Sequence, residues 1–330
     1  MSRAAAVAAP SLLLRVAAAA AGGALYALGY LGWGAWPCLF LFLIPLWWAL
    51  AAGPSRVGTA AVLGFVFGFA AFAGGHLWLL ALIGPYLDGR FATGIALWIA
   101  YGAWFALAFA AYGALLDGAR ARGWPPALGA IAPFVLVEWL QPQIFPLYAG
   151  NGLVAVPLLA QTADLGGPLL LTGLLAGANL LLFEVWRWSE GRQAVPLRLV
   201  GVGTGVAIAV VAYGAARIAA VEDASAHAPP IRVGLVQANL DVAAKDRLGV
   251  LSHREHLAQT RALLAEHDVD LVVWPESAYV RGIRRPLPIA SRPIVADVAV
   301  PLLFGASGTM EIDGRKVKSN SVFLAREDGA

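Results

Sequence analysis

Cysteine and charge are both scarce in this sequence. A single cysteine, Cys38, excludes an intrachain disulfide framework and a cysteine-rich metal site. Charged residues make up 13% of the 330 residues and hydrophobic residues 60%, and the mean hydropathy is +0.72. So little polar surface cannot cover a soluble globule, which predicts a protein with several membrane spans. The net charge of +3 is small and its basic residues are scattered, so no nucleic-acid partner is indicated.

The charged residues divide the chain into two parts. Residues 1–219 hold 10 Lys+Arg and 6 Asp+Glu, whereas residues 220–330 hold 13 and 14. We therefore predict a transmembrane helical domain over 1–220 and a water-exposed domain over 221–330. The predicted fold class is an all-α membrane bundle joined to an α/β domain.

Seven apolar segments can be marked in the first part, and most approach the roughly 20 residues that a spanning helix needs. They are Ala5–Tyr30, Cys38–Ala51, Thr59–Gly84, Ala92–Leu116, Ala127–Leu140, Gly167–Trp186 and Leu199–Ala219. The second and the fifth are short. The first could instead be a signal peptide, because a basic residue precedes its alanine-rich core.

The arginines predict the orientation of these spans. With a cytoplasmic amino terminus, the loop that holds Arg90 is outside, and the other loop arginines fall on the inside: Arg3, Arg56, Arg120, Arg122, Arg187, Arg192 and Arg198. Arg15 falls in the cytoplasmic half of the first span. This asymmetry fits the positive-inside rule. Seven spans then place residue 220 and everything after it on the outside face.

Three features of the membrane part are candidates for function. Glu138 is an ionisable group in an apolar run; it either faces a polar cavity or lies at the headgroup level beside Trp139. His76 is expected to be hydrogen-bonded inside the bundle, as a lone histidine in an apolar helix commonly is. The proline- and glycine-rich segment Gln141–Ala160 is too broken for a span and too apolar for a solvated loop, so it is re-entrant or lies on the membrane surface. The spacing Gly64-Phe-Val-Phe-Gly68 indicates close helix packing.

The second part predicts an α/β pattern with an antiparallel hairpin. The expected elements are a strand in Ile231–Asn239, a helix over Leu251–His267, a strand before Pro275, a strand at Pro301–Gly305 and a hairpin over Met310–Ala325 that turns at Asp313-Gly314. Strand, helix and strand follow one another in the order typical of an open α/β sheet.

One carboxylate is placed where such sheets carry their active sites. The stretch Asp270–Ser277 is a short buried strand that Pro275 ends, and Glu276 follows immediately. Glu276 therefore lies at the carboxyl end of a strand, the usual place for a ligand site in an open α/β sheet. The alternative is that Glu276 is a solvated acid in a loop.

Four motifs in this part occur in the order found in the carbon–nitrogen hydrolase (nitrilase) superfamily, which they resemble. They are Val236-Gln-Ala-Asn239, Leu271–Ser277, Leu303-Phe-Gly-Ala-Ser307 and Asn320-Ser-Val-Phe-Leu324. The membrane part adds the Gly-Phe and Gly-Gly pairs in Gly64–Leu80 and the pair Glu138-Trp139. Together they are similar to the apolipoprotein N-acyltransferase family of the bacterial inner membrane, and the resemblance covers nearly the whole chain.

This resemblance implies a two-step acyl transfer in the bacterial inner membrane. A cysteine thiolate takes a fatty acyl chain from a phospholipid as a thioester, and the free α-amine of an apolipoprotein's diacylglyceryl-cysteine then accepts it. Glu276 matches the family's general base, which deprotonates the thiol and later the amine; a partly buried carboxylate is suited to this role. A lysine stabilises the oxyanion of each tetrahedral intermediate.

The sequence also departs from the family pattern. The family's lysine and cysteine follow the strand that corresponds to Asn320–Leu324. Few residues follow Leu324 in this sequence. Lys316 and Lys318 precede that strand and are expected to be solvated, and neither Lys245 nor Cys38 matches. We therefore expect an incomplete nitrilase-like sandwich and an inactive fragment of an enzyme; a degenerate homologue or a domain completed by a second polypeptide are alternatives. Acidic and histidine residues do not cluster at ligand spacings, so no metal or organic cofactor is predicted.

Two further classes of function compete with the acyltransferase. A membrane-tethered amidase of the same superfamily needs one span, not seven. A non-catalytic lipid-binding or transport protein with an extracytoplasmic cap is the other class. Transport predicts ionisable residues in several spans or broken helices in repeated halves, whereas the spans of this sequence offer mainly Glu138.

Overall fold

The computed structural model describes most of the chain as two compact units, Met1–Ala226 and His227–Ala330. The residues it describes are 10–30, 33–54, 56–86, 91–191, 193–240, 249–284, 292–295 and 297–326. The boundary expected at Ala220 falls inside the last helix of the first unit, α9 (Leu197–His227), because this helix continues for about two more turns.

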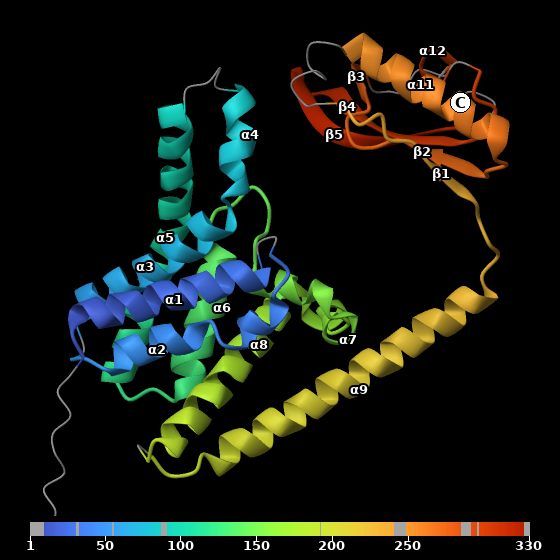
Figure 1. Cartoon of the computed structure of the whole chain (residues 1–330). Helices are drawn as coiled ribbons and strands as arrows, with labels where there is room; N and C mark the ends of the chain where they lie inside the picture. The colour runs from blue at the N-terminus through green and yellow to red at the C-terminus, as the bar shows by residue number, and fades with distance from the viewer. Residues whose placement is uncertain are drawn as a thin grey trace, which may run out of the picture. The chain divides into compact units, whose positions relative to one another are not determined.

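The first unit is a bundle of helices (Figure 1). Its elements are α1 (Leu12–Tyr30), η1 (Trp36–Phe40), α2 (Leu43–Ala51), α3 (Val57–Gly75), α4 (Trp78–Tyr86), α5 (Phe91–Ala121), η2 (Ala127–Ile131), α6 (Ala132–Leu140), η3 (Ala149–Ala155), α7 (Pro157–Ala160), α8 (Ala163–Ser189) and α9. Among the described residues, five helices are long and apolar enough to cross a membrane: α1, α3, α5, α8 and α9. The two short predicted segments form shorter apolar helices, Trp36–Ala51 and Ala127–Leu140. The membrane-type bundle is thus found, and the number of seven spans stays a prediction.

The segment Thr59–Gly84 was expected to be one span, but it is not one continuous helix. It breaks at His76 into α3 and α4, directly after two glycines that weaken a helix. The His76 ring is buried and hydrogen-bonded on both sides, by Nδ1 to the Phe72 carbonyl at 3.0 Å and by Nε2 to the Tyr101 hydroxyl at 2.9 Å. His76 is therefore satisfied inside the bundle, as expected, and its ring holds the break against α5.

Small residues bring α3 and α5 into close contact. A side chain on Gly64 or Gly113 would collide with the backbone of the facing helix, at Phe109 and Ala60 respectively. Gly68 packs on Ala106 and Phe109 of α5 in the same way. The glycine spacing predicted as a packing feature therefore sets the distance between these two helices.

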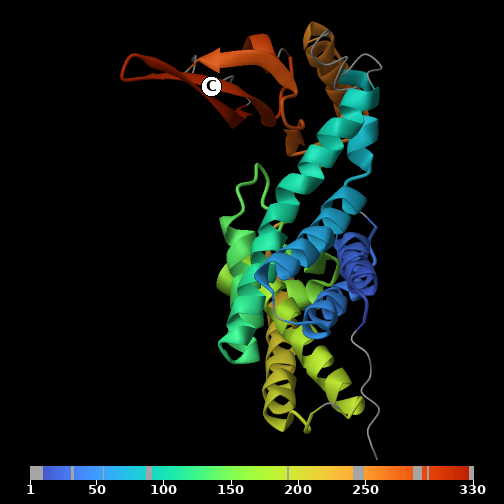
Figure 2. The ribbon, with the colours of Figure 1, turned by 90° about the vertical axis from the view of Figure 1, so that its left-hand side faces the viewer.

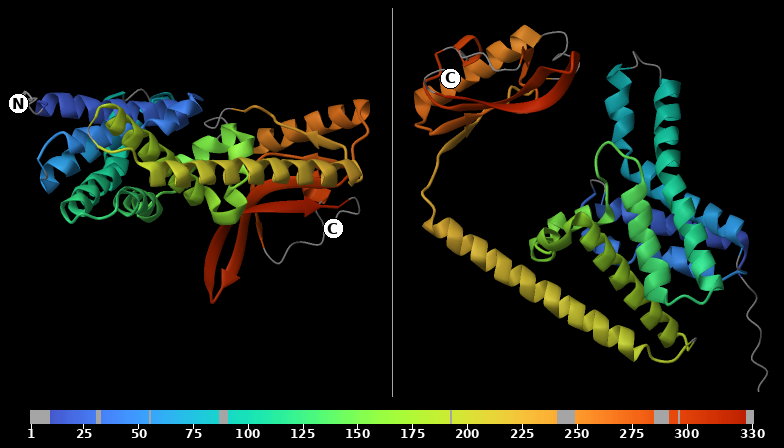
Figure 3. Two further views of the ribbon diagram at one scale, coloured as in Figure 1. Left: turned by 90° about the horizontal axis from the view of Figure 1, so that it is seen from below. Right: turned by 180° about the vertical axis from the view of Figure 1, so that it is seen from behind.

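The second unit is a five-stranded mixed sheet with α11 packed on it (Figures 1 and 3). Its elements are β1 (Val233–Leu235), α11 (Gly249–Glu266), β2 (Leu271–Val273), β3 (Tyr279–Arg284), α12 (Arg292–Val295), β4 (Leu302–Ile312) and β5 (Arg315–Ala325). Strands β1, β2 and β4 are parallel neighbours, as the strand–helix–strand order predicted. Strand β3 and the short helix α12 were not predicted.

The predicted hairpin is present as β4 and β5 (Figure 2). It turns at Asp313 and Gly314, whose φ angles of 50° and 72° are those of a type I′ turn. Strand β5 pairs with β4 along its whole length, from Ile312 opposite Arg315 to Leu302 opposite Ala325. This long pairing makes β4 the central strand of the unit.

A small core joins α11 to the sheet. Trp274, which is 2% exposed, lies at the end of β2 and donates from its indole Nε1 to the Thr260 hydroxyl of α11 at 2.9 Å. Phe304 stacks on Phe323 across β4 and β5 with ring centres 5.8 Å apart. These contacts fix the end of β2, where the candidate base follows.

Candidate functional site

Glu276 occupies a gap between two strands. One edge of β4 pairs first with β2, at Leu302 and Leu303, and then with β3, from Ala306 onward. Glu276 lies in the tight turn that leads from β2 to β3, in which the Ala278 amide donates to the Pro275 carbonyl at 3.2 Å. The carboxylate therefore stands at the carboxyl end of β2, as its position in the sequence predicted.

A glycine on β4 makes room for this turn. A Cβ atom built on Gly305 would lie 2.7 Å from both the Cα of Glu276 and the amide nitrogen of Ser277. Real Cβ atoms do not approach other atoms so closely, so only glycine fits there without a shift. Ser277 itself takes a left-handed conformation with φ of 54°, which non-glycine residues rarely adopt. Because strained backbone persists only where its surroundings impose it, the turn is held in shape by β4.

The carboxylate is oriented from the other side of β4. Asn320 of β5 donates from Nδ2 to Oε1 of Glu276 at 2.6 Å. In the sheet, Asn320 pairs with Ser307, two residues beyond Gly305. Asn320 was part of a recognised motif but had no predicted role, because its contact with Glu276 depends on strand register. The only sequence signal was a polar residue two positions before the apolar run Val322–Leu324.

Glu276 lines an open cavity of about 350 Å³. The other lining residues are Val273, Trp274, Leu303, Phe304, Gly305, Asn320, Ser321 and Val322. Mostly apolar walls with the polar side chains of Glu276, Asn320 and Ser321 suit a substrate that carries an apolar chain. Glu276 is exposed rather than partly buried, because the described strands cover only one side of its turn.

The lysines and the cysteine that were compared with the family's catalytic residues are not placed beside this carboxylate by the structure. Lys316 and Lys318 are exposed on β5 near the hairpin turn, as expected, with Lys316 opposite Glu311. Lys245 lies outside the described residues. Cys38 is half-buried in η1 of the helical unit. Among the residues placed by the structure, no group of three or more His, Cys, Asp and Glu could hold a metal ion.

A second polar centre lies inside the helical unit, around Glu138. This carboxylate is 5% exposed and accepts hydrogen bonds from the Tyr26 hydroxyl at 3.3 Å, from the Thr172 hydroxyl at 2.9 Å and from the Ala149 amide at 3.1 Å to each oxygen. It is therefore enclosed by the bundle and faces no large cavity. Its contacts fix the start of η3 against α1 and α8.

The segment 141–156 that follows Glu138 is irregular apart from η3. Ile144 and Phe145 at its tip are 91% and 74% exposed, and Val154 is 77% exposed. Such apolar exposure fits a segment that contacts lipid and does not fit a solvated loop. It agrees with the expectation that this segment is re-entrant or lies on the membrane surface.

Comparison with known proteins shows what most of this chain is similar to. Residues 22–181 match the sequence model of the apolipoprotein N-acyltransferase N-terminal domain. Over these residues the chain is similar to apolipoprotein N-acyltransferases. It is 28% identical over 321 residues to the apolipoprotein N-acyltransferase of Geobacter metallireducens, and the match covers 92% of this chain and 59% of that protein. The resemblance inferred from the motifs is thus confirmed.

Other apolipoprotein N-acyltransferases show the same extent of similarity. That of Rhizobium rhizogenes is 30% identical over 281 residues, covering 78% of this chain and 50% of that protein. That of Azotobacter vinelandii is 31% identical over 297 residues, covering 82% and 51%. The chain therefore spans between half and three fifths of the length of these curated relatives.

Proposed function

We propose that this chain provides the membrane unit and the general base of an acyltransferase. The enzyme moves a fatty acyl chain from a phospholipid to the N-terminal diacylglyceryl-cysteine of apolipoproteins. The observation that carries the proposal is the carboxylate of Glu276, oriented by Asn320 in the lining of a mainly apolar cavity. The similarity of nearly the whole chain to apolipoprotein N-acyltransferases supports the same reaction.

In this mechanism Glu276 moves protons in both half-reactions. It first takes the proton of a cysteine thiol as the thiolate attacks the ester carbonyl of the phospholipid, and it returns that proton to the departing alkoxide of the lysophospholipid. It next takes a proton from the lipoprotein amine as the amine attacks the thioester, and it gives this proton to the departing cysteine thiolate. One carboxylate can serve both steps because it is regenerated after each. The thiol and the oxyanion-stabilising lysine are those implied by the family.

The mixed sheet, in this proposal, is part of a nitrilase-like sandwich. Glu276 follows the central parallel strands, and β4 carries the glycine that its turn requires. A tight turn on a buried strand holds a side chain more rigidly than a long loop does, which is the property a general base needs.

The positive-inside rule supports the topology, with a cytoplasmic amino terminus and the sheet-bearing unit on the periplasmic side. A version in which Cys38 is replaced by serine allows a direct test with single introduced cysteines. A cysteine at Ser319 should react with a membrane-impermeant maleimide added to intact spheroplasts. A cysteine at Arg122 should react only after the membrane is opened. The reverse labelling pattern would contradict the topology.

The base is tested with Glu276→Gln in the protein expressed from its own gene. Acylation is measured as the mass increase of a lipoprotein in cells depleted of their own N-acyltransferase. We expect Glu276→Gln to remove acylation while the protein stays in the membrane. Glu311→Gln neutralises an exposed carboxylate near the hairpin end of β4 and should leave acylation unchanged. Equal acylation by the wild type and Glu276→Gln would contradict the proposed role.

A further inference from the structure

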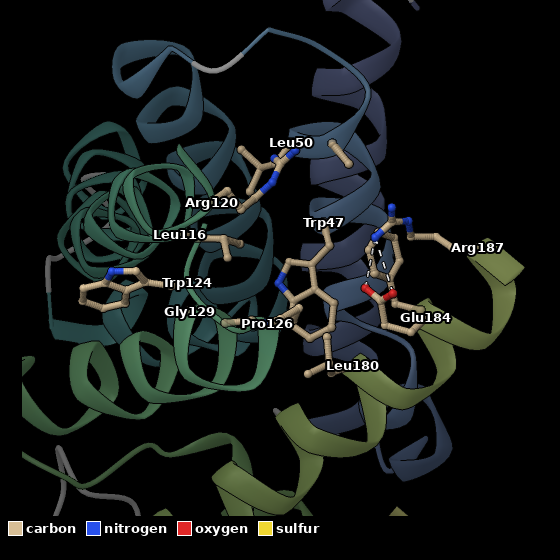
Figure 4. Close-up of a pocket in the computed structure, with 13 residues that line it drawn as sticks. Trp47, Leu50, Leu116, Arg120, Trp124, Pro126, Gly129, Leu180, Glu184 and Arg187 are labelled. Atoms are coloured by element: carbon tan, nitrogen blue, oxygen red, sulfur yellow. Dashed lines mark hydrogen bonds and ion pairs between the residues drawn. The ribbon is translucent and has the colours of Figure 1, made fainter. Parts of the chain in front are cut away.

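A second cavity, of about 340 Å³, lies within the helical unit (Figure 4). The residues that line it are far from Glu276 in the sequence. It is bounded by the last turns of α2, α5 and α8 and by η2. Most of its lining is apolar, with three charged side chains at the edge: Trp47, Leu50, Ala51, Leu116, Arg120, Trp124, Pro126, Gly129, Ala130, Leu180, Phe183, Glu184 and Arg187. The indole of Trp47 projects into the middle of the group. Glu138 lies at the other end of α6.

Arginine dominates the charge at this cavity. The Arg120 side chain is exposed, and the structure shows no hydrogen bond from its guanidinium to a described residue. Arg187 lies 5.8 Å over the ring of Phe183 and pairs with Glu184 at 3.2 Å. Arg15 and Arg187 both lie within electrostatic range of Arg120.

Two carboxylates offset part of this positive charge. Glu184 is paired with Arg187, and Asp117, one turn before Arg120 on α5, is buried. Among the residues that line the cavity, two arginines against one acid leave its edge positive. A ligand that carries one negative charge would complete the balance.

The apolar wall continues beyond the cavity. A neighbouring hollow of about 520 Å³ shares Pro126, Leu180 and Glu184 with it and extends over the first turn of α9, along Val195, Leu197 and Leu199. Leu197 is 73% exposed there. A cationic pocket that adjoins an exposed apolar surface matches a molecule with an anionic head and an acyl chain.

We propose that this pocket binds one anionic phospholipid, with its phosphate against Arg120 and Arg187 and one acyl chain along Leu180 and Leu197. Basic pockets between membrane helices commonly hold anionic headgroups. The positive-inside rule assigns this end of the bundle to the cytoplasmic leaflet, whose surface potential is negative. The bound lipid joins α5 to α8, the two helices that supply the arginines.

Native mass spectrometry of the whole chain in detergent tests the proposal. The protein is incubated with equal amounts of phosphatidylglycerol and phosphatidylcholine that carry the same acyl chains. We expect the wild type to retain phosphatidylglycerol in preference, and Arg120→Gln to retain about fivefold less of it. Glu184→Gln should retain more, because Arg187 is then released from its acidic partner.

Matched variants separate binding from folding. Arg122→Gln removes a charge from the same end of α5, but Arg122 donates to the Gly118 carbonyl at 2.9 Å and does not line the cavity. It should bind as the wild type does, and Arg120→Lys should keep most of the binding. An excess of glycerol 1-phosphate should not displace the lipid. Equal retention of both lipids, equal losses in Arg120→Gln and Arg122→Gln, or displacement by glycerol 1-phosphate would overturn the proposal.

Discussion

Asn320 donates a hydrogen bond of 2.6 Å to Glu276, although 44 positions separate these residues in the chain. Strand β4 lies between them in the sheet and holds them in register: the Glu276 turn packs on Gly305, and Asn320 pairs opposite Ser307. The orientation of the proposed base is therefore a property of three strands and not of the segment that carries it.

Asn320→Ala should lower the rate of acylation by roughly 10–100-fold, because the carboxylate then samples unproductive orientations. Measured with a purified lipoprotein acceptor, the loss should appear in kcat with little change in KM. Ser319→Ala, on the neighbouring position of β5 and hydrogen-bonded to Ser321, is the control and should remain active. A rise in KM with kcat unchanged would instead point to a role in substrate binding.

Gly305→Ala should displace the turn that carries Glu276. The new Cβ would meet backbone atoms at 2.7 Å, and such overpacking costs about 1–3 kcal/mol of unfolding free energy or moves the turn. Either result should reduce acylation sharply. Gly282→Ala is the matched control on β3, where the nearest atoms to an added Cβ are 3.7 Å away. Thermal unfolding of both variants separates lost stability from a displaced carboxylate.

Glu138→Ala should destabilise the helical unit. It leaves the buried donors of Tyr26, Ala149 and Thr172 without their acceptor, at about 1–3 kcal/mol for each group left unpaired. Glu138→Gln keeps an acceptor oxygen and should be milder. Unfolding temperatures in detergent give the comparison, and identical values for the two variants would show that these hydrogen bonds contribute little.

The second unit should lose stability in acid through two exposed aspartates. The Arg232 backbone amide, followed by its side chain, lowers the pKa of Asp270, and the Arg261 side chain lowers that of Asp297. A carboxyl whose pKa is lower in the folded state stabilises the fold above its unfolded pKa, about 3.9, and loses this contribution as the pH falls through the folded pKa. Denaturant titrations followed by tryptophan fluorescence between pH 6 and pH 3 should show a lower unfolding midpoint below about pH 4.

Asp270→Asn is the control for this acid dependence. It should lower stability at pH 7 and flatten the dependence below pH 4, because one of the titrating groups is gone. An unchanged acid profile in Asp270→Asn would show that its pairing with Arg232 does not contribute. The same comparison can be made at Asp297, which Arg261 contacts at 2.6 Å.

Local patterns were sufficient to predict many elements. The apolar lengths predicted the long helices, the pair Asp313-Gly314 predicted the hairpin turn, and Pro275 predicted the end of β2 and hence the place of Glu276. Strand β3 was missed because Tyr279–Arg284 has a glycine and two arginines and is a strand only through its pairing with β4. The break at His76 was missed because the apolar run continues through it.

The sequence by itself determined that the chain has a long apolar part and an α/β part, and that one carboxylate follows a buried strand. These properties depend on composition, on periodicity and on residues within a few positions of each other. The tertiary structure decided that Asn320 and Gly305 serve Glu276, that Glu138 holds η3, and that Arg120 and Arg187 border one cavity. Such contacts join residues far apart in the chain, and only strand register and helix packing bring them together.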